Sequence, residues 1–169
     1  MGVILLRHTT PKVEHGVCYG MTDLALAESF EAEAAEIVRQ ATRPVRIVTS
    51  PLGRCRRLAD RMGAVFGLEP QVDPRWREMD FGTWEGVAWS AIPRHELDGW
   101  AAAFHDYNGH GGESVAQLEA RVRAALTSLP EGALVVTHAG CIKAACAIRG
   151  QPPGWEARPR FGEAVQLAD

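Results

Sequence analysis

The sequence predicts an α/β fold, a three-layer sandwich in which helices cover both faces of a mostly parallel central sheet. Short apolar runs, typical of buried strands, alternate along the chain with longer segments whose apolar residues recur at helical spacing. Strands separated by helices pair in parallel, and a parallel sheet is covered on both faces. The length of 169 residues, 46% of them hydrophobic and 23% charged, is typical of one globular domain spanning residues 1–169.

Five segments have the apolar or β-branched character of strands. They are residues 3–6, residues 45–49, a short extended piece around Val72 and Trp76, residues 134–137 and residues 161–167. The first, second and fourth are followed at once by polar residues. We therefore expect polar groups to gather where these strands end.

Four segments have helical periodicity, namely residues 28–41, 52–66, 114–129 and 142–148. Pro51 can open the second helix, because proline is tolerated in a first turn. Ser114 or a neighbour is expected to cap the third, and Gly150 and Pro152 end the last. The glycine-rich residues 108–112 form the most flexible-looking stretch.

Composition excludes several classes of function. A net charge of −3 argues against nucleic-acid binding through bulk charge, so an anionic substrate must be held by locally placed arginines. No apolar segment approaches the ~20 residues of a membrane span, and the first residues lack the features of a signal peptide. We therefore expect a cytoplasmic protein with no membrane partner; no signal indicates an oligomeric state. The cysteines form no CxxC pair and no zinc-type spacing, so we expect reduced, mostly structural thiols at Cys18, Cys55, Cys141 and Cys146.

The apolar run at residues 3–6 stops at the pair Arg7 and His8. The carboxyl ends of parallel strands are where open α/β sheets bind ligands. An arginine beside a histidine at such a place suggests an anionic, phosphorylated ligand next to a nucleophile.

His138 occupies the same position after the run at residues 134–137. One histidine at a strand end is commonly a hydrogen-bonded loop residue, but two at equivalent ends indicate a shared site. The small residues Ala139 and Gly140 would let backbone N–H groups approach an oxyanion.

Arg54 lies in the first turn of the helix that follows the strand at residues 45–49. A helix N-terminus and an arginine both favour a phosphate. The alternative is that Arg54 belongs, with Arg56, Arg57 and Arg61, to a solvated helix face.

Residues 77–86, REMDFGTWEG, alternate acids with aromatic residues and glycines and suggest a structured loop. A carboxyl group beside bulky apolar groups retains its proton more readily than one in water, which suits a general acid. Glu78, Asp80 and Glu85 are all eligible, and composition does not choose between them. The alternative is a surface loop with solvated acids.

Taken together, these segments resemble the histidine phosphatase superfamily, with its phosphoglycerate-mutase-like fold. The matching motifs share the order and spacing of the family and run nearly end to end. They are LRHT at residues 6–9, S-x-L-x-R at 50–54, E-x-x-x-G-x-W-E-G at 78–86, GES at 112–114 and THAG at 137–140.

The resemblance implies a role for each matching residue. His8 would be the nucleophile that becomes phosphorylated, Arg7, Arg54 and His138 would bind the phosphoryl oxygens, and Glu78 would be the proton donor. Two arginines and a protonated His138 would supply the charge without a metal or other cofactor. To attack, His8 must be neutral, with its second ring nitrogen donating to a backbone carbonyl.

A finer resemblance concerns residues 18–26, CYGMTDLAL, and 81–86, FGTWEG, which are similar to α-ribazole phosphatases. It implies a small-molecule phosphomonoester substrate, α-ribazole 5′-phosphate or cobalamin phosphate, in cobalamin biosynthesis. The alternative for residues 18–20 is a turn with a packing aromatic. Other candidates are a broad-specificity sugar-phosphate or nucleotide phosphatase, a protein phosphohistidine phosphatase, and a silent phosphate-binding regulatory module. Glu14, where mutase-like members usually place asparagine, counts against mutase activity.

Four further side chains could line the pocket. Trp84 and Trp89 could stack on a base, but we expect at least one of them to pack in the core. His105 and His110 are expected to be solvated loop histidines.

Overall fold

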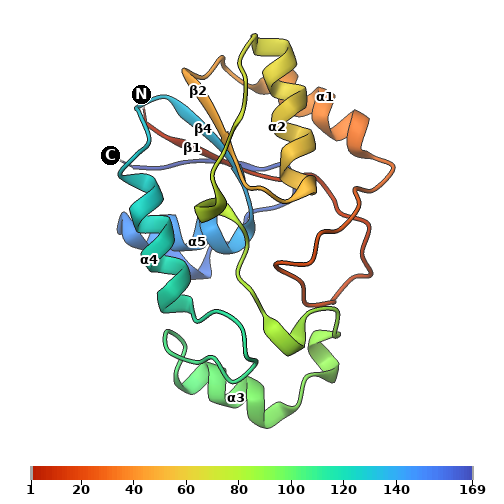
Figure 1. The fold of residues 1–169 in the computed structure, drawn as a ribbon, viewed down its shortest axis with the longest axis vertical. Coiled ribbons are helices and arrows are strands. Elements are labelled where there is room, and N and C mark those ends of the chain that lie inside the picture. The colour runs from red at the N-terminus through yellow and green to blue at the C-terminus, as the bar shows by residue number, and fades with distance from the viewer. Residues whose placement is uncertain (1, 169) are drawn as a thin grey trace.

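The computed structural model describes residues 2–168 and contains a five-stranded sheet in the order β3-β2-β4-β1-β5. The strands β1, β2, β3 and β4 run parallel, and β5 pairs antiparallel with β1. This confirms a mostly parallel sheet (Figure 1). The strands are β1 (Ile4–Arg7), β2 (Arg46–Thr49), β3 (Gln71–Val72), β4 (Ala133–Thr137) and β5 (Ala164–Gln166).

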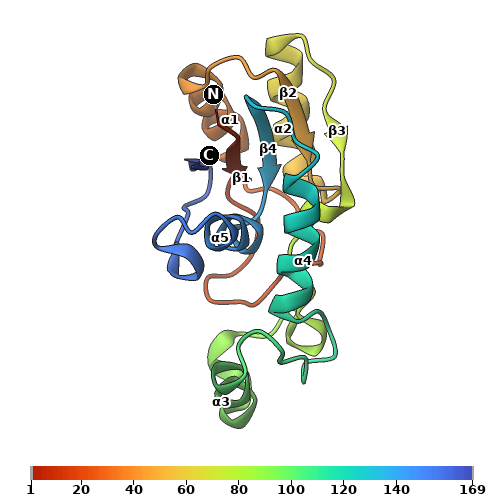
Figure 2. The ribbon, with the colours of Figure 1, turned by 90° about the vertical axis from the view of Figure 1, so that its left-hand side faces the viewer.

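Helices cover both faces of this sheet, as the sequence predicts. The helices α1 and α2 lie on one face, α4 and α5 lie on the other, and α3 stands apart at one end of the molecule (Figures 1 and 2). The helices are α1 (Phe30–Gln40), α2 (Gly53–Phe66), α3 (Arg94–Ala102), α4 (Val115–Leu126) and α5 (Ala139–Ile148).

Alternation along the strands divides the core between the two faces, because successive strand residues point in opposite directions. Leu5 packs in the cluster that contains Ile142 of α5, whereas Leu6 packs in the cluster that contains Leu58 of α2. Both leucines are fully or almost fully buried. Burial of each side chain contributes roughly 1.5–3 kcal/mol, which fixes β1 in the middle of the sandwich.

The expected boundaries are close to the observed ones, but the short extended piece ends at Val72, because Trp76 belongs to a 3-10 turn at Pro74–Trp76. Before α4, the hydroxyl of Ser114 accepts from the Gln117 N–H at 3.2 Å and the Gln117 amide accepts from the Ser114 N–H at 2.9 Å. This reciprocal pair confirms Ser114 as the helix cap. The helix α5 starts at Ala139 instead of residue 142, so its N-terminus follows His138 directly.

No element is predicted from the sequence for residues 94–102, which form α3. None of its side chains is fully buried, so its apolar repeat is weak.

The expectation of a solvated His110 is wrong. Its side chain is completely buried, its Nδ1 accepts from the Gly112 N–H at 3.0 Å, and its ring lies 4.8 Å from the Trp84 ring. His105 is exposed, as expected.

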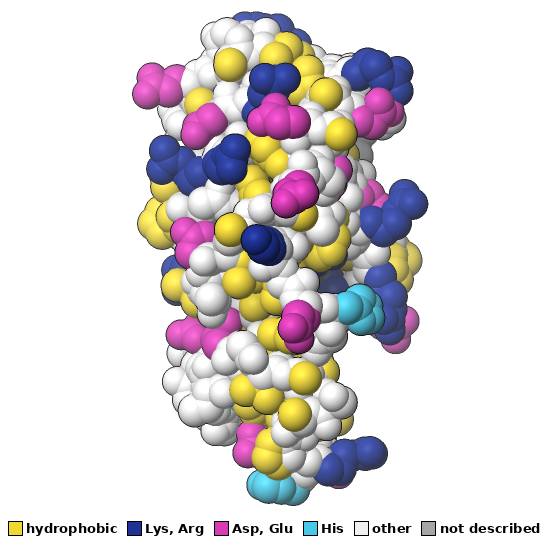
Figure 3. Space-filling model, turned by 90° about the vertical axis from the view of Figure 1, so that its right-hand side faces the viewer, with side chains coloured by type: hydrophobic (Ala, Val, Ile, Leu, Met, Phe, Trp, Pro, Cys, Tyr) yellow, Lys and Arg dark blue, Asp and Glu magenta, His cyan; other side chains and the backbone are white. Residues whose placement is uncertain are grey.

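The mixed charge of the surface and the free cysteine thiols agree with what the composition predicts. On the face drawn in Figure 3, basic and acidic side chains are interspersed. Within residues 2–168, no helix combines the length and apolar character needed to cross a bilayer. All four cysteines are free and buried, as expected of structural thiols.

Candidate active site

The register of the sheet brings the two strand-end histidines together. Arg7 of β1 is aligned with Thr137 of β4, so His8 and His138 each follow the end of a neighbouring parallel strand. Their ring centroids are 5.2 Å apart. The residue after β2, Ser50, places its hydroxyl 2.7 Å from Nε2 of His138. The predicted clustering at the carboxyl edge of the sheet is confirmed.

His8 has the protonation state that a nucleophile requires. Its Nδ1 lies 2.7 Å from the carbonyl oxygen of Thr9. A carbonyl only accepts, so Nδ1 carries a hydrogen, and in the neutral ring the lone pair then lies on Nε2. Burial and the positive charges of Arg54 and Arg7 lower the pKa of His8 to about 3, although the Thr9 hydrogen bond acts in the opposite direction. The expected backbone acceptor is confirmed, and the lowered pKa favours the neutral ring.

The surroundings of His138 lower the pKa of its ring. It is fully buried, and burial, together with His8 and Arg54, lowers its pKa well below the ordinary value. These surroundings favour the neutral ring, and a protonated His138 beside a bound phosphoryl group stays a prediction. Only an anion placed beside the ring would favour its protonated form.

The buried neutral His8 makes stability depend on pH. In the unfolded chain a histidine binds a proton below pH ~6.5, whereas folded His8 binds one only near pH 3. The unfolded state then holds more protons, so the free energy of unfolding falls as the pH drops through this window, by at most about 1.4 kcal/mol per pH unit for this residue.

Urea unfolding of wild type and His8→Asn between pH 6.5 and 3 tests this expectation. The variant should show a shallower fall, because asparagine does not titrate. The matched variant His95→Asn, at an exposed position, should keep the wild-type slope. Equal slopes for His8→Asn and wild type would contradict a neutral, buried His8.

Backbone carbonyls orient the two arginines. Arg54 is completely buried, and its guanidinium donates to the carbonyls of Thr22 at 2.7 Å and Gly20 at 2.6 Å. Arg7 donates to the carbonyl of Pro159 at 2.8 Å and lies 3.9 Å from the ring centre of Phe161. The solvated-face alternative is therefore wrong for Arg54. It holds for its three neighbours, which are exposed: Arg56, Arg57 and Arg61.

Three buried polar atoms around His8 have no hydrogen-bond partner among residues 2–168. They are Nε of Arg7, Nε of Arg54 and Oγ1 of Thr9. Buried polar groups in native proteins are nearly always paired, so this concentration of unpaired donors needs an explanation.

The structure distinguishes the three acids of the 77–86 loop. Glu78 is 8% exposed and lines the same cavity as Arg7 and His8. Its Oε1 accepts from the Met79 N–H at 2.9 Å and its Oε2 from the Gly140 N–H at 3.0 Å. A Cβ at position 140 would overlap the carboxylate, so only glycine permits this approach. The Gly140 N–H thus serves Glu78, which corrects the expectation that it faces an oxyanion.

The other two acids shape the loops around the site. Glu85 accepts from the backbone of Gly20 and Met21, at 2.9 and 2.8 Å, and from the Thr22 hydroxyl at 2.8 Å. It therefore fixes the loop whose carbonyls hold Arg54. Asp80 accepts from the Gly82 N–H at 2.8 Å. Neither carboxylate lines the cavity.

The cavity that His8 lines has a volume of about 620 Å³. One wall is aromatic: Trp89 stacks on Trp100 with centroids 5.9 Å apart and planes at 12°. Trp84 is buried in the core beneath it, as expected for one of the two tryptophans. Lining residues that sequence reasoning missed are Tyr19, Trp100, Phe104, Lys143, Trp155, Arg158 and Phe161. The richness in tryptophan was the available signal, but only the fold brings these rings together.

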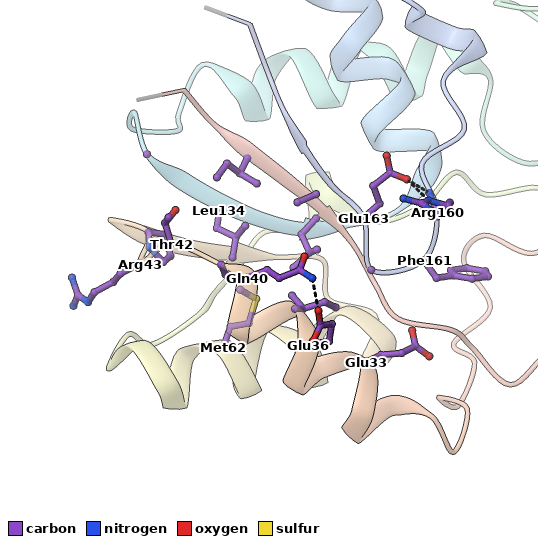
Figure 4. Close-up of a pocket in the computed structure, with 18 of the residues that line it drawn as sticks. Glu33, Glu36, Gln40, Thr42, Arg43, Met62, Leu134, Arg160, Phe161 and Glu163 are labelled. Carbon is purple, nitrogen blue, oxygen red and sulfur yellow. Dashed lines mark hydrogen bonds and ion pairs between the residues drawn. The ribbon is translucent and has the colours of Figure 1, made fainter.

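A second cavity of about 590 Å³ lies between α1 and the strands β1 and β4 (Figure 4). Its lining includes Glu36, Gln40, Met62 and Leu134, and none of the five predicted site residues. Among residues 2–168, no group of three or more histidine, cysteine or acidic side chains is arranged to hold a metal.

An α/β sandwich with two histidines and two arginines at the carboxyl edge of its sheet defines a class of phosphate-handling proteins. The chain belongs to the histidine phosphatase superfamily (branch 1), whose profile matches residues 3–161. Its fold is phosphoglycerate-mutase-like. It is similar to the structure of TTHB049 from Thermus thermophilus, with a TM-score of 0.82, 27% identity, and coverage of 99% of this chain and 93% of that one.

Two curated relatives are both described as probable phosphoglycerate mutase GpmB. The relative from Erwinia tasmaniensis is 34% identical over 131 residues, which cover 70% of this chain and 60% of the relative. The relative from Salmonella paratyphi C is 32% identical over 175 aligned residues, covering 94% of this chain and 80% of the relative. The chain therefore spans only part of their length.

Proposed function

We propose that the protein is a metal-independent phosphomonoesterase that works through a phosphohistidine on His8. The observation that carries the proposal is the combination of a neutral His8 and the unpaired Nε groups of Arg7 and Arg54 beside it. A phosphoryl group would pair with those donors through charge-assisted hydrogen bonds. Its negative charge would also favour protonation of His138, which would then add a third positive charge.

In the first half-reaction, the Nε2 lone pair of His8 attacks phosphorus and the ester P–O bond breaks. The protonated carboxyl of Glu78 gives its proton to the leaving alkoxide, and the alcohol departs. Phosphoryl transfer needs mainly an aligned nucleophile and charge stabilisation, which this site supplies without a further chemical group.

In the second half-reaction, the carboxylate of Glu78 takes a proton from water, and the water oxygen attacks phosphorus. The P–N bond breaks, inorganic phosphate leaves, and His8 regains its lone pair. One residue acts as acid and then as base, so Glu78 returns to its starting state.

For the substrate we propose α-ribazole 5′-phosphate or cobalamin phosphate, in cobalamin biosynthesis. The stacked Trp89 and Trp100 support this choice, because a flat base gains from stacking on an aromatic wall. Residues 18–20 give less support to the choice of α-ribazole 5′-phosphate as substrate. Cys18 is buried and the Gly20 carbonyl holds Arg54, so Tyr19 alone of the three lines the cavity.

A second candidate substrate is a small carboxylated phosphate such as phosphoglycerate. The half-buried Lys143 and the exposed Arg158 line the cavity and have the charge to bind a carboxylate. The two relatives from Erwinia tasmaniensis and Salmonella paratyphi C, described as probable phosphoglycerate mutases, point to the same substrate. Glu14, which counts against a mutase, is exposed and does not line the cavity.

A panel of phosphomonoesters measured in EDTA tests both parts of the proposal. We expect phosphate release unaffected by the chelator and the highest kcat/KM for α-ribazole 5′-phosphate. A preference for 3-phosphoglycerate would favour the second candidate, and phosphoryl transfer to its other hydroxyl would indicate a mutase. A flat profile would favour a broad-specificity phosphatase. Phosphate binding without turnover of any ester would indicate a silent binding module.

A further inference from the structure

A buried ion pair outside the site holds the backbone that carries Glu78. Arg121 belongs to α4 and Glu113 precedes that helix, and their side chains are only 11% and 10% exposed. Nε of Arg121 donates to one carboxylate oxygen at 2.6 Å and Nη2 to the other at 2.8 Å. This two-point contact fixes the plane of the guanidinium.

The remaining donors of Arg121 reach carbonyls of the segment that ends in Glu78, and Nη1 also lies 3.9 Å from the Cys141 sulfur. Its Nη1 donates to the carbonyls of Arg75 and Arg77, both at 2.7 Å, and its Nη2 donates to the carbonyl of Glu78 at 3.2 Å. A guanidinium has five N–H donors, so each now has a partner. Burial lowers the pKa of Arg121, but Glu113 and Cys141 together outweigh it through hydrogen bonds and charge, and the net shift is upward. The guanidinium of Arg121 therefore stays charged.

Other side chains complete this support. The Thr137 hydroxyl donates to the carbonyl of Trp76 at 2.8 Å, and the Cys141 thiol donates to the carbonyl of Arg77 at 3.0 Å. On the far side of Glu78, the Glu113 N–H donates to the carbonyl of Asp80 at 2.8 Å. The backbone on both sides of Glu78 is thus fixed by α4, β4 and α5, and the Glu113–Arg121 pair supplies most of the contacts.

We propose that Arg121, anchored by Glu113, is a positioning residue for proton transfer by Glu78; the inference rests on the proposed role of Glu78. A general acid must come within about 2.6–3.2 Å of the atom that it protonates. A displacement of ~1 Å from such a geometry can cost about 10²-fold in rate. The lysine ammonium group carries only three N–H donors on one nitrogen atom. It therefore cannot replace the five N–H donors that the planar guanidinium of Arg121 holds in fixed directions.

The test is Arg121→Lys on two substrates that differ in their need for an acid. An alkyl phosphate such as β-glycerol phosphate needs a proton on its leaving oxygen, whereas p-nitrophenyl phosphate needs little help. We expect kcat on the alkyl ester to fall about 10²-fold, kcat on the aryl ester to fall far less, and KM to stay near wild type for both.

Two further variants keep the inference testable if Arg121→Lys does not fold. Glu113→Gln removes the anchoring charge and should give the same selective loss to a smaller degree. Arg123→Lys is the matched control: Arg123 lies on the same helix as Arg121, is exposed, and donates to the Glu119 carboxylate at 2.8 Å. Its side chain reaches no carbonyl at residues 77–78, so the ratio of the two rates should not change.

The outcomes separate this inference from the proposed function. If Arg121 acts through Glu78, the double variant Glu78→Gln/Arg121→Lys should discriminate between the esters no more than Glu78→Gln alone. Equal losses on both esters in Arg121→Lys and Glu113→Gln, with Glu78→Gln still selective, would overturn the positioning role only. Equal losses on the two esters in Glu78→Gln would instead overturn the acid role of Glu78 within the proposed function.

Discussion

Replacing His8 with alanine is expected to reduce kcat on every phosphomonoester by about 10⁴-fold or more, as for other catalytic nucleophiles. Alanine leaves no atom to accept the phosphoryl group, and water does not occupy the position of Nε2 with the same alignment. Steady-state phosphate release from p-nitrophenyl phosphate in EDTA measures the effect. Because Arg7 and Arg54 remain in place, inorganic phosphate should still bind to the variant.

His95→Ala is the matched control, since His95 is an exposed histidine of α3. It should retain wild-type kcat and KM. A His8→Ala protein with substantial activity would contradict the proposed nucleophile, as would wild-type activity that depends strictly on a metal.

Replacing Glu78 with glutamine is expected to slow turnover of alkyl phosphates by about 10²–10⁴-fold, the usual contribution of a general acid. Glutamine has nearly the same shape, but its single oxygen can accept from only one of the two N–H groups, those of Met79 and Gly140, that Glu78 binds. It has no acidic proton to donate to an alkoxide. The loss on p-nitrophenyl phosphate should be much milder. The ratio of kcat on the two substrates is the measured quantity.

Asp80→Asn is the matched control for Glu78→Gln, because Asp80 lies in the same loop and does not line the cavity. Its amide oxygen can still accept from the Gly82 N–H. We expect an unchanged ratio of rates. A selective loss on alkyl phosphates in Asp80→Asn, without one in Glu78→Gln, would contradict the acid role of Glu78.

The sheet and both strand-end histidines could be predicted from the sequence because their signals are local. An apolar run marks each strand, and parallel pairing brings the residues after such runs to one edge. His8, His138 and Ser50 meet for this reason. The same logic placed Arg54 near the site, although only its complete burial separates it from the exposed arginines of α2.

The remaining features depend on contacts that sequence spacing does not report. Glu78, Asp80 and Glu85 look alike in the sequence, and tertiary contacts with Gly140 and the 20–22 loop distinguish them. The helix α3 escaped prediction because none of its side chains is fully buried. Arg121 resembles an ordinary surface arginine until Glu113 and the carbonyls of residues 75, 77 and 78 surround it.

The central claim is that a phosphoryl group passes through His8, and rapid acid-free quenching followed by intact-protein and peptide mass spectrometry tests it most directly. With p-nitrophenyl phosphate, the account predicts one added phosphoryl mass on the peptide that contains His8. The adduct should be labile to acid, more abundant in Glu78→Gln, and absent in His8→Ala. A phosphoryl group on another residue, or steady turnover with no adduct in Glu78→Gln, would contradict the account.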